Sequence, residues 1–202
     1  MNAHLPAKSV SDRIIESAIA LFAVKGYEGV SVKELTQAAG VNSALISYYF
    51  GGKKELYSHV LSTQLAILES IVHEMQHKLL APPERIYCFA QQLIAAHHKF
   101  PHLIRLVMVE IINPTDCFES LVKKTIEKIN YFLRGCIQEG IDEGEFKAEV
   151  DPAVAAIAIV GMINFYFMTL PLSRELSMGK EANNNCTEQS IRYYLQGIST
   201  AC

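Results

Sequence analysis

The stretch from Val32 to Leu56 constrains the fold of this chain more than any other part, because two short helical patterns meet there at a glycine. In the first pattern, apolar residues recur at helical spacing, and Ser31 precedes them as an N-cap whose hydroxyl can accept a backbone N–H. Gly40 then ends the helix, since glycine adopts the left-handed conformation that a sharp corner between helices needs. Asn42 starts a second helix as another N-cap. The block therefore predicts two helices joined by a tight turn.

The second helix, predicted over Ser43 to Tyr49, turns Leu45 or Ile46 inward and leaves a small polar and aromatic face. Small residues at the start of a helix permit close approach to base edges in the major groove of DNA, whereas tyrosine hydroxyls and lysines reach phosphates. The alternative is a helical hairpin of any all-α protein. The conjunction of turn, spacing and basic tail favours a helix-turn-helix. The residues predicted to contact DNA are Lys33, Asn42, Ser43, Ala44, Leu45, Ser47, Tyr48, Tyr49 and Lys53.

Four motifs carry a family resemblance. They are Ser31-Val32-Lys33-Glu34-Leu35, Ala39-Gly40-Val41-Asn42, Tyr48-Tyr49-Phe50-Gly51-Gly52-Lys53-Lys54-Glu55-Leu56 and, ending an earlier helix, Phe22-Ala23-Val24-Lys25-Gly26-Tyr27. Over these motifs the chain resembles the N-terminal domain of the tetracycline-repressor (TetR) family of bacterial transcription regulators. The chain departs from the family pattern at Ser47, where a tyrosine is frequent, and at Leu45, where threonine or serine is common. These departures leave open which side chains contact the bases.

The resemblance implies an all-α protein with an N-terminal three-helix helix-turn-helix DNA-binding domain and a C-terminal helical ligand-binding and dimerisation domain. The expected divisions are a flexible arm over 1–10, the DNA-binding domain over 11–57 and the effector-binding and dimerisation domain over 58–202. Beyond the first domain the pattern stays helical, without strand alternation. We expect helices over 53–80, 84–100, 102–112, 118–143 and 188–199, and one opened by Asp151 as N-cap and Pro152 in the first turn.

That helix is unusually apolar, because no residue from Ala153 to Leu170 is charged. A membrane span is the alternative, but acidic residues rather than basic anchors precede the segment, and Asn164 lies inside it. We expect it to be buried in a core and a subunit interface instead. The resemblance implies a homodimer formed by the last two helices of each chain; an intramolecular core of a monomer is the alternative.

The resemblance also implies that the middle helices enclose a pocket for a small-molecule effector. Their methionine, aromatic and aliphatic side chains suit an apolar or amphipathic molecule, and no dense charge cluster indicates a nucleotide or a phosphate. Each candidate can equally be ordinary core. The candidates are Leu93, His97, Leu106, Met108, Val109, Glu110, Tyr131, Phe132, Met162, Asn164, Phe165 and Tyr166.

A metal- or redox-sensing regulator is the alternative hypothesis. His73 and His77 lie at helical i,i+4 spacing, and Cys88 or Glu74 would have to complete a metal site. Cys88 and Cys136 are the candidate redox-sensitive thiols, although thiols in apolar helices are normally inert. No phosphate loop, nucleophile elbow or distinctive carboxylate pair is present, so we expect neither an enzyme nor a cofactor.

Composition agrees with a regulator. With 202 residues, of which 50% are hydrophobic, the chain can bury a substantial core. Its net charge of −3 argues against non-specific binding of nucleic acid by the whole molecule. Through residue 60 the six basic and five acidic residues give only +1, a modest basic surface that would rely on two subunits to grip DNA. Five cysteines without paired spacing and an N-terminus without an export signal favour the cytoplasm. The helix-turn-helix motifs and the family resemblance together imply a repressor released from a palindromic DNA operator by an apolar or amphipathic effector. A protein-binding or architectural module is the alternative, and no membrane partner is expected.

Overall fold

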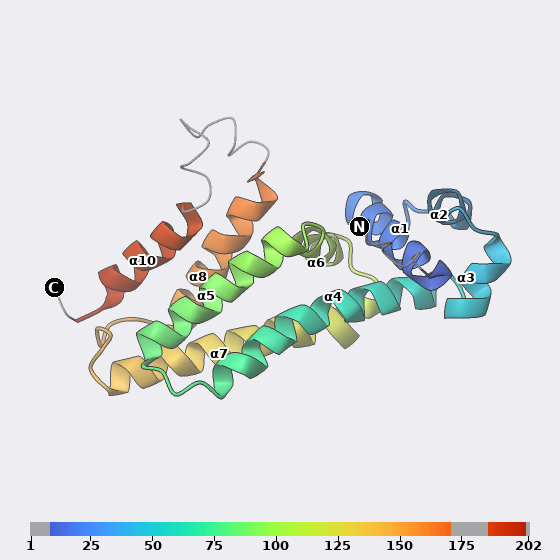
Figure 1. Ribbon diagram of the computed structural model, residues 1–202. Coiled ribbons are helices and arrows are strands. Elements are labelled where there is room, and N and C mark those ends of the chain that lie inside the picture. The colour runs from blue at the N-terminus through green and yellow to red at the C-terminus, as the bar shows by residue number, and fades with distance from the viewer. Residues whose placement is uncertain (1–8, 171–185, 201–202) are drawn as a thin grey trace, which may run out of the picture. The chain divides into compact units, whose positions relative to one another are not determined.

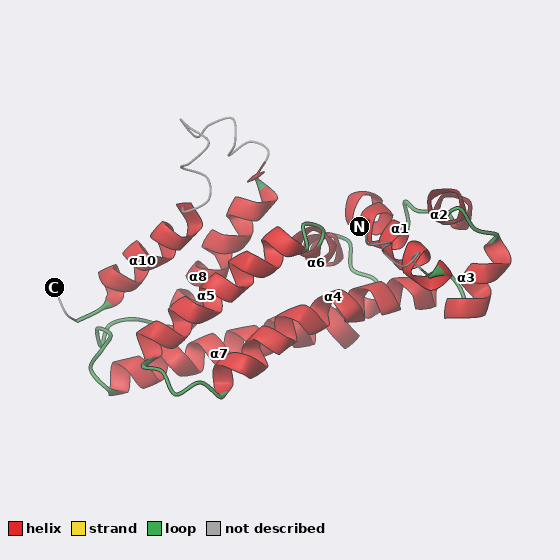
Figure 2. Ribbon diagram, viewed as in Figure 1, coloured by secondary structure: helices red, strands yellow, loops and turns green. Residues whose placement is uncertain are grey.

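The computed structural model describes residues 9–170 and 186–200, and each element named in these ranges is a helix (Figures 1 and 2). The expectation of an all-α fold is confirmed. Within the described ranges, β pairing is limited to one isolated bridge between Phe146 and Ser199. The elements are α1 (Val10–Lys25), α2 (Val32–Ala39), α3 (Ser43–Phe50), α4 (Lys53–Gln76), α5 (Pro82–Lys99), α6 (Leu103–Ile112), the five-residue π-helix η1 (Phe118–Val122), α7 (Lys123–Asp142), α8 (Pro152–Met168) and α10 (Cys186–Ile198).

The chain separates into two compact units. The first, here called the head, comprises Met1–Gln64 and Arg105–Val122, and the second, the body, comprises Leu65–Ile104 and Lys123–Cys202. Helix α4 begins in the head and ends in the body, whereas α6 begins in the body and ends in the head. The contacts therefore group a segment from the middle of the sequence with the N-terminal helices. Residues 1–8 of the expected arm lie outside the described residues.

Local sequence signals fix the helices of the head. Ser31 caps α2 in a reciprocal capping box with Glu34, and Gly40 ends α2 in the left-handed conformation, with φ 63° and ψ 45°. Asn42 caps α3, and Gly51, with φ 88°, ends it. The predicted caps and the predicted glycine corner are confirmed. The predicted arm ran to residue 10, but α1 already starts at Val10, because Ser9 and Asp12 form a capping box there.

The head has its own apolar core. Ile46 is the α3 residue that is buried, while Leu45 is half-buried. The rings of Phe22 and Tyr57 meet edge to face with centroids 4.7 Å apart, and Tyr27 packs beside them. The buried apolar side chains of the head's first four helices are Ile14, Ala18, Phe22, Ala23, Leu35, Ala39, Ile46, Leu56, Tyr57, Val60 and Leu61.

In the body, α5 packs on α7, α8 and α10, and α8 also packs on α7 and α10. Their core includes Ile86, Phe89, Leu133, Ile159 and Ile191. Helix α4 ends at Gln76 rather than at residue 80, and α5 starts at Pro82, earlier than expected, because proline is tolerated in the first turn of a helix. As expected, Asp151 caps α8, accepting the backbone N–H groups of Ala153 and Val154 at 2.7 and 3.2 Å. None of the described helices combines the length and apolarity that crossing a membrane requires.

Candidate nucleic-acid interface

Helix α3 presents most of its predicted DNA-contacting residues to solvent. Ser43, Ala44, Ser47, Tyr48 and Tyr49 are exposed, and Tyr48 is the most open of them, at 80%. The Tyr48 and Tyr49 rings meet edge to face with centroids 5.1 Å apart, and both side chains are exposed rather than packed into the core. This exposed set, with half-buried Leu45, forms the surface of α3 that can enter a groove.

The N-terminus of α3 is closed by Asn42. Its Oδ1 accepts the backbone N–H of Ala44 at 3.0 Å and the hydroxyl of Ser43 at 3.3 Å. The cap fixes where the helix starts, and the remaining N–H groups of the first turn and the helix dipole favour a phosphate there. Asn42 thus positions the first turn of α3 chiefly through its side-chain oxygen.

Two lysines flank α3 without an ion pair among the described residues. Lys33 is exposed in the first turn of α2, and the Nζ of Lys53 lies 4.2 Å from the centroid of the Tyr27 ring. By contrast, Lys25 contacts Glu34 at 2.6 Å, and this hydrogen bond, with those from Ser31, lowers the pKa of Glu34 to about 2. Lys33 and Lys53 are therefore lysines near α3 that no carboxylate of the described residues engages, and their contact with phosphates stays a prediction.

A buried hydrogen-bond network lies inside the head. Glu110 of α6 is completely buried, and its Oε1 accepts the hydroxyl of Tyr57 at 2.6 Å. Its Oε2 accepts the backbone N–H and the hydroxyl of Thr115, at 3.3 and 3.2 Å. Burial and the bond to Glu110 raise the pKa of Tyr57. This network joins α4, α6 and the segment after α6.

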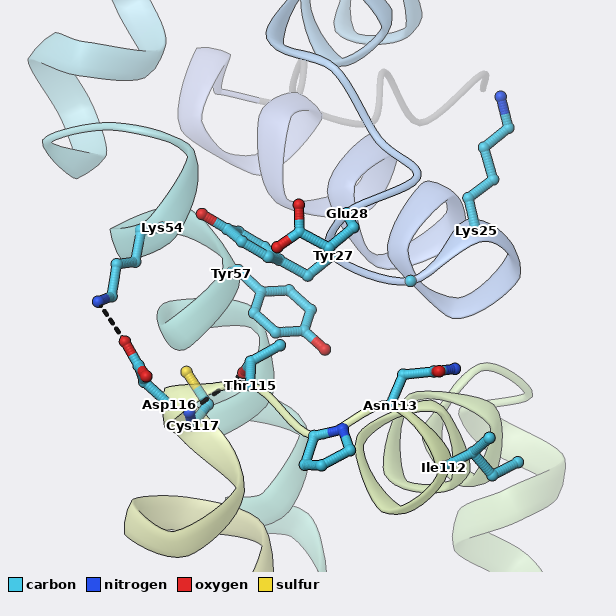
Figure 3. Close-up of a pocket in the computed structure, with 12 residues that line it drawn as sticks. Lys25, Tyr27, Glu28, Lys54, Tyr57, Ile112, Asn113, Thr115, Asp116 and Cys117 are labelled. Atoms are coloured by element: carbon cyan, nitrogen blue, oxygen red, sulfur yellow. Dashed lines mark hydrogen bonds and ion pairs between the residues drawn. The ribbon is translucent and has the colours of Figure 1, made fainter.

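A cleft of about 690 Å³ lies in the head, between the end of α1, the start of α4 and residues 112–117 (Figure 3). Figure 3 shows the ammonium of Lys54 directed at the carboxylate of Asp116, and the two groups are 2.6 Å apart. The sequence did not predict this cleft or the Tyr57 network. The available signal was Glu110 itself, a carboxylate among apolar residues of α6, since a buried charge needs partners.

The predicted effector residues divide between the units. Leu106, Met108, Val109 and Glu110 belong to the head, and the others belong to the body. Leu93, His97, Leu106, Phe132 and Glu110 are buried, Met108, Val109, Met162, Asn164 and Tyr166 are half-buried, and Tyr131 and Phe165 are exposed. None of these placements tests contact with an effector, which stays a prediction.

The structure brings together two of the predicted effector residues, His97 and Asn164. The Nε2 of His97 lies 3.2 Å from Oδ1 of Asn164, so this pairing assigns the ring proton to Nε2. His97 is 3% exposed, and its Nδ1 has no hydrogen-bond partner among the described residues. Burial lowers the pKa of His97 to about 4, which leaves the ring uncharged at neutral pH. The body therefore holds a neutral buried histidine with one unused acceptor.

The residues proposed for metal or redox sensing do not form a site in the described part of the chain. The rings of His73 and His77 pack against each other with centroids 4.7 Å apart, and no group of three or more potential metal ligands occurs among the described residues. Cys136 is buried, and burial raises the pKa of its thiol, which disfavours the reactive thiolate. Nothing observed supports the metal or redox alternative.

Two sequence profiles match this chain. Residues 14–60 match the bacterial regulatory proteins of the tetR family, and residues 80–168 match the tetracyclin repressor-like C-terminal domain. The probable HTH-type transcriptional regulator YttP of Bacillus subtilis (strain 168) is 30% identical over 142 residues, which cover 68% of each chain.

Two further transcriptional regulators are similar to this chain, one in sequence and one in structure. The biofilm operon icaADBC HTH-type negative transcriptional regulator IcaR of Staphylococcus aureus (strain Newman) is 26% identical over 138 residues, covering 68% of this chain and 73% of IcaR. Among solved structures, the TetR family transcriptional regulator PfmR from Thermus thermophilus superposes with a TM-score of 0.72 and 25% identity. That superposition covers 92% of this chain and 98% of PfmR.

Proposed function

The chain belongs to the tetR family of bacterial regulatory proteins, and from this premise we propose that it is a repressor that binds a palindromic operator as a homodimer and leaves it when an effector binds. As a family member it is a DNA-binding transcriptional regulator and not an enzyme. The observation that carries the proposal is the exposed, capped α3 between Lys33 and Lys53. Repression is supported by the name of IcaR, a negative regulator. Such a protein acts on the chromosome, in the cytoplasm.

Lys53→Ala is expected to weaken binding to all DNA duplexes alike, because a lysine at this place contacts phosphate rather than a base edge. Each phosphate contact contributes about 0.9 to the slope of log affinity against log salt, so the slope should fall by about one unit per subunit. Fluorescence anisotropy with a selected operator and a scrambled duplex, each at several salt concentrations, measures both effects.

Lys124→Ala is the matched control, because Lys124 is exposed on α7 in the body and its removal changes the net charge equally. It should leave both slopes unchanged. Equal slopes for Lys53→Ala and the wild type would contradict the phosphate assignment. If neither protein distinguishes the operator from the scrambled duplex, sequence-specific binding itself is lost as an interpretation.

The dimer is proposed to form through the outer face of α8. Val154, Ile157, Phe165 and Met168 are exposed on α8, and a Cβ added at Gly161 would meet no atom within 4 Å. These residues repeat every three or four positions, so they form one apolar stripe that a second copy can cover. Ile159, Ile191 and Leu195 are buried within a single chain and are assigned to its core instead.

The effector is proposed to bind in the body near His97 and Asn164. An unpaired buried acceptor such as Nδ1 of His97 costs free energy that a ligand donor can recover, and Leu93, Phe132 and Phe167 supply apolar surface in the same unit. Helix α4 runs through both units and is proposed to carry the signal. A ligand that prefers the DNA-free state by about 3 kcal/mol lowers operator occupancy more than a hundredfold.

An effector that acts in this way must bind operator-loaded protein more weakly than free protein, by the same factor by which it weakens operator binding. Amphipathic small molecules that raise the melting temperature of the protein provide the candidates. Calorimetric titration of one such molecule with and without saturating operator measures the two affinities. Equal affinities exclude induction by that molecule, and equality for every stabilising molecule makes a constitutive DNA binder the better account.

A further inference from the structure

The side chains of α3 cover a small range of chemical types. From Ser43 to Phe50 the helix carries serine, alanine, leucine, isoleucine, tyrosine and phenylalanine, and no charged or amide side chain. Its exposed groups are therefore the hydroxyls of Ser43, Ser47, Tyr48 and Tyr49, the methyl group of Ala44 and the tyrosine rings, and half-buried Leu45 adds some apolar surface. Whatever sequence information α3 reads must come from hydroxyl groups and apolar surface.

Asn42, the amide residue next to α3, does not extend this set. An asparagine that reads adenine uses its oxygen and its nitrogen together, accepting from N6 and donating to N7. The Oδ1 of Asn42 already accepts the Ala44 N–H and the Ser43 hydroxyl, so the bidentate contact would remove the cap. Lys33 and Gln37 lie on α2, which in a helix-turn-helix crosses the backbone and contacts phosphates.

The chemistry of the major groove then decides what α3 can distinguish. Guanine is read by arginine or lysine, adenine by asparagine or glutamine, and cytosine by a carboxylate, whereas serine hydroxyls bond to any base. Apolar surface has one counterpart in the groove, the C5 methyl group of thymine. Ala44 and Tyr48 are four positions apart, so their exposed methyl and ring share one face of the helix.

We infer that α3 reads its half-site chiefly through thymine methyl groups, which contact Ala44 and Tyr48, and that the base pairs beneath α3 are A·T-rich. This inference rests on the proposed function, since it assumes that α3 enters the major groove of an operator. It assigns specificity to apolar contact and leaves the hydroxyls of Ser43 and Ser47 as adaptable hydrogen-bonding groups.

The test begins with the full-length protein and a library of random duplexes, from which bound duplexes are enriched. Each thymine of the enriched half-site is then replaced by uracil, which removes only the C5 methyl group. We expect a loss of about fourfold in affinity for each contacted methyl group, and about fifteenfold when both half-sites are changed. Replacing guanines by 7-deazaguanine, which removes the N7 acceptor, is expected to change affinity less than twofold.

Two variants tie the effect to α3. In Ala44→Gly and Tyr48→Ala the penalty for uracil is measured within each variant, so any loss of helix stability cancels. We expect the penalty to vanish at one thymine position in each variant and to persist at all positions in Gln37→Ala, the matched control on α2.

The outcomes separate the inference from the proposed function. If no duplex is enriched, sequence-specific DNA binding fails and the inference fails with it. If a duplex is enriched but every uracil substitution stays within twofold, or if 7-deazaguanine causes the larger loss, DNA binding stands and thymine reading is overturned. A uracil penalty that survives in both Ala44→Gly and Tyr48→Ala also overturns it, because other residues would then read the methyl groups.

Discussion

Ile157→Asp is expected to convert the protein into a folded monomer that has lost operator binding. Ile157 is 65% exposed on α8, so the single chain tolerates a carboxylate there, but a second copy seated on the stripe would bury that charge. Burying an unpaired carboxylate costs several kcal/mol, and about 3 kcal/mol already weakens dimerisation more than a hundredfold. Sedimentation velocity at micromolar concentration, circular dichroism and operator binding together measure the result.

Ile159→Asp is the matched comparison, two residues further along the same helix. Ile159 has no exposed surface within one chain, so the same carboxylate enters the core of the body and is expected to unfold it. The pair therefore separates an interface from a core. A dimer that survives Ile157→Asp, or a folded Ile159→Asp, would contradict the proposed arrangement of α8.

Tyr57→Phe is expected to reduce the free energy of unfolding of the head by about 1–3 kcal/mol, because it leaves Oε1 of completely buried Glu110 without its donor. Glu110→Leu should cost at least as much, since it strands the Tyr57 hydroxyl and both donors of Thr115. Urea denaturation, followed by hydrogen exchange of the α1 and α4 amides, measures the loss and locates it.

The double variant Tyr57→Phe/Glu110→Leu should be less destabilised than the sum of the single variants, because both sides of the Tyr57–Glu110 bond are then removed and only the donors of Thr115 stay unpaired. Tyr48→Phe is the control, since its hydroxyl lies on an 80% exposed side chain and its removal should change stability by no more than about 0.5 kcal/mol. Additive losses, or a Tyr57→Phe variant as stable as Tyr48→Phe, would mean that the buried bond contributes no net stability.

The features that sequence predicted are those encoded within a few residues. Ser31, Gly40 and Asn42 act on neighbours at most four positions away, so their roles follow from local hydrogen bonding and backbone freedom alone. Periodicity limited the buried residue of α3 to Leu45 or Ile46, and the structure selects Ile46. The ends of α4 and α5 were harder to predict, because the first-turn prolines of α5 are compatible with an earlier start.

Contacts between side chains far apart in the sequence could not be predicted from such local patterns. Tyr57 and Glu110 are 53 positions apart, and His97 and Asn164 are 67 positions apart, so only the fold brings them together. The sequence named His97, Asn164 and Glu110 as candidates for contact with an effector, but it could not give their partners. For Glu110 the partners proved to be Tyr57 and Thr115 of the head, and its proposed contact with an effector stays a prediction.

The membership of Arg105–Val122 in the head bears on how such regulators can be recombined. The match to the C-terminal domain spans residues 80–168. If recombination between two regulators joined their genes near residue 80, residues 105–122 would come from the other protein. The head of the recipient protein would then have another protein's residue at the position of Glu110, opposite its own Tyr57. A recombined regulator would therefore keep this buried hydrogen bond only if Tyr57 and Glu110 came from the same parent, although they are far apart in the sequence.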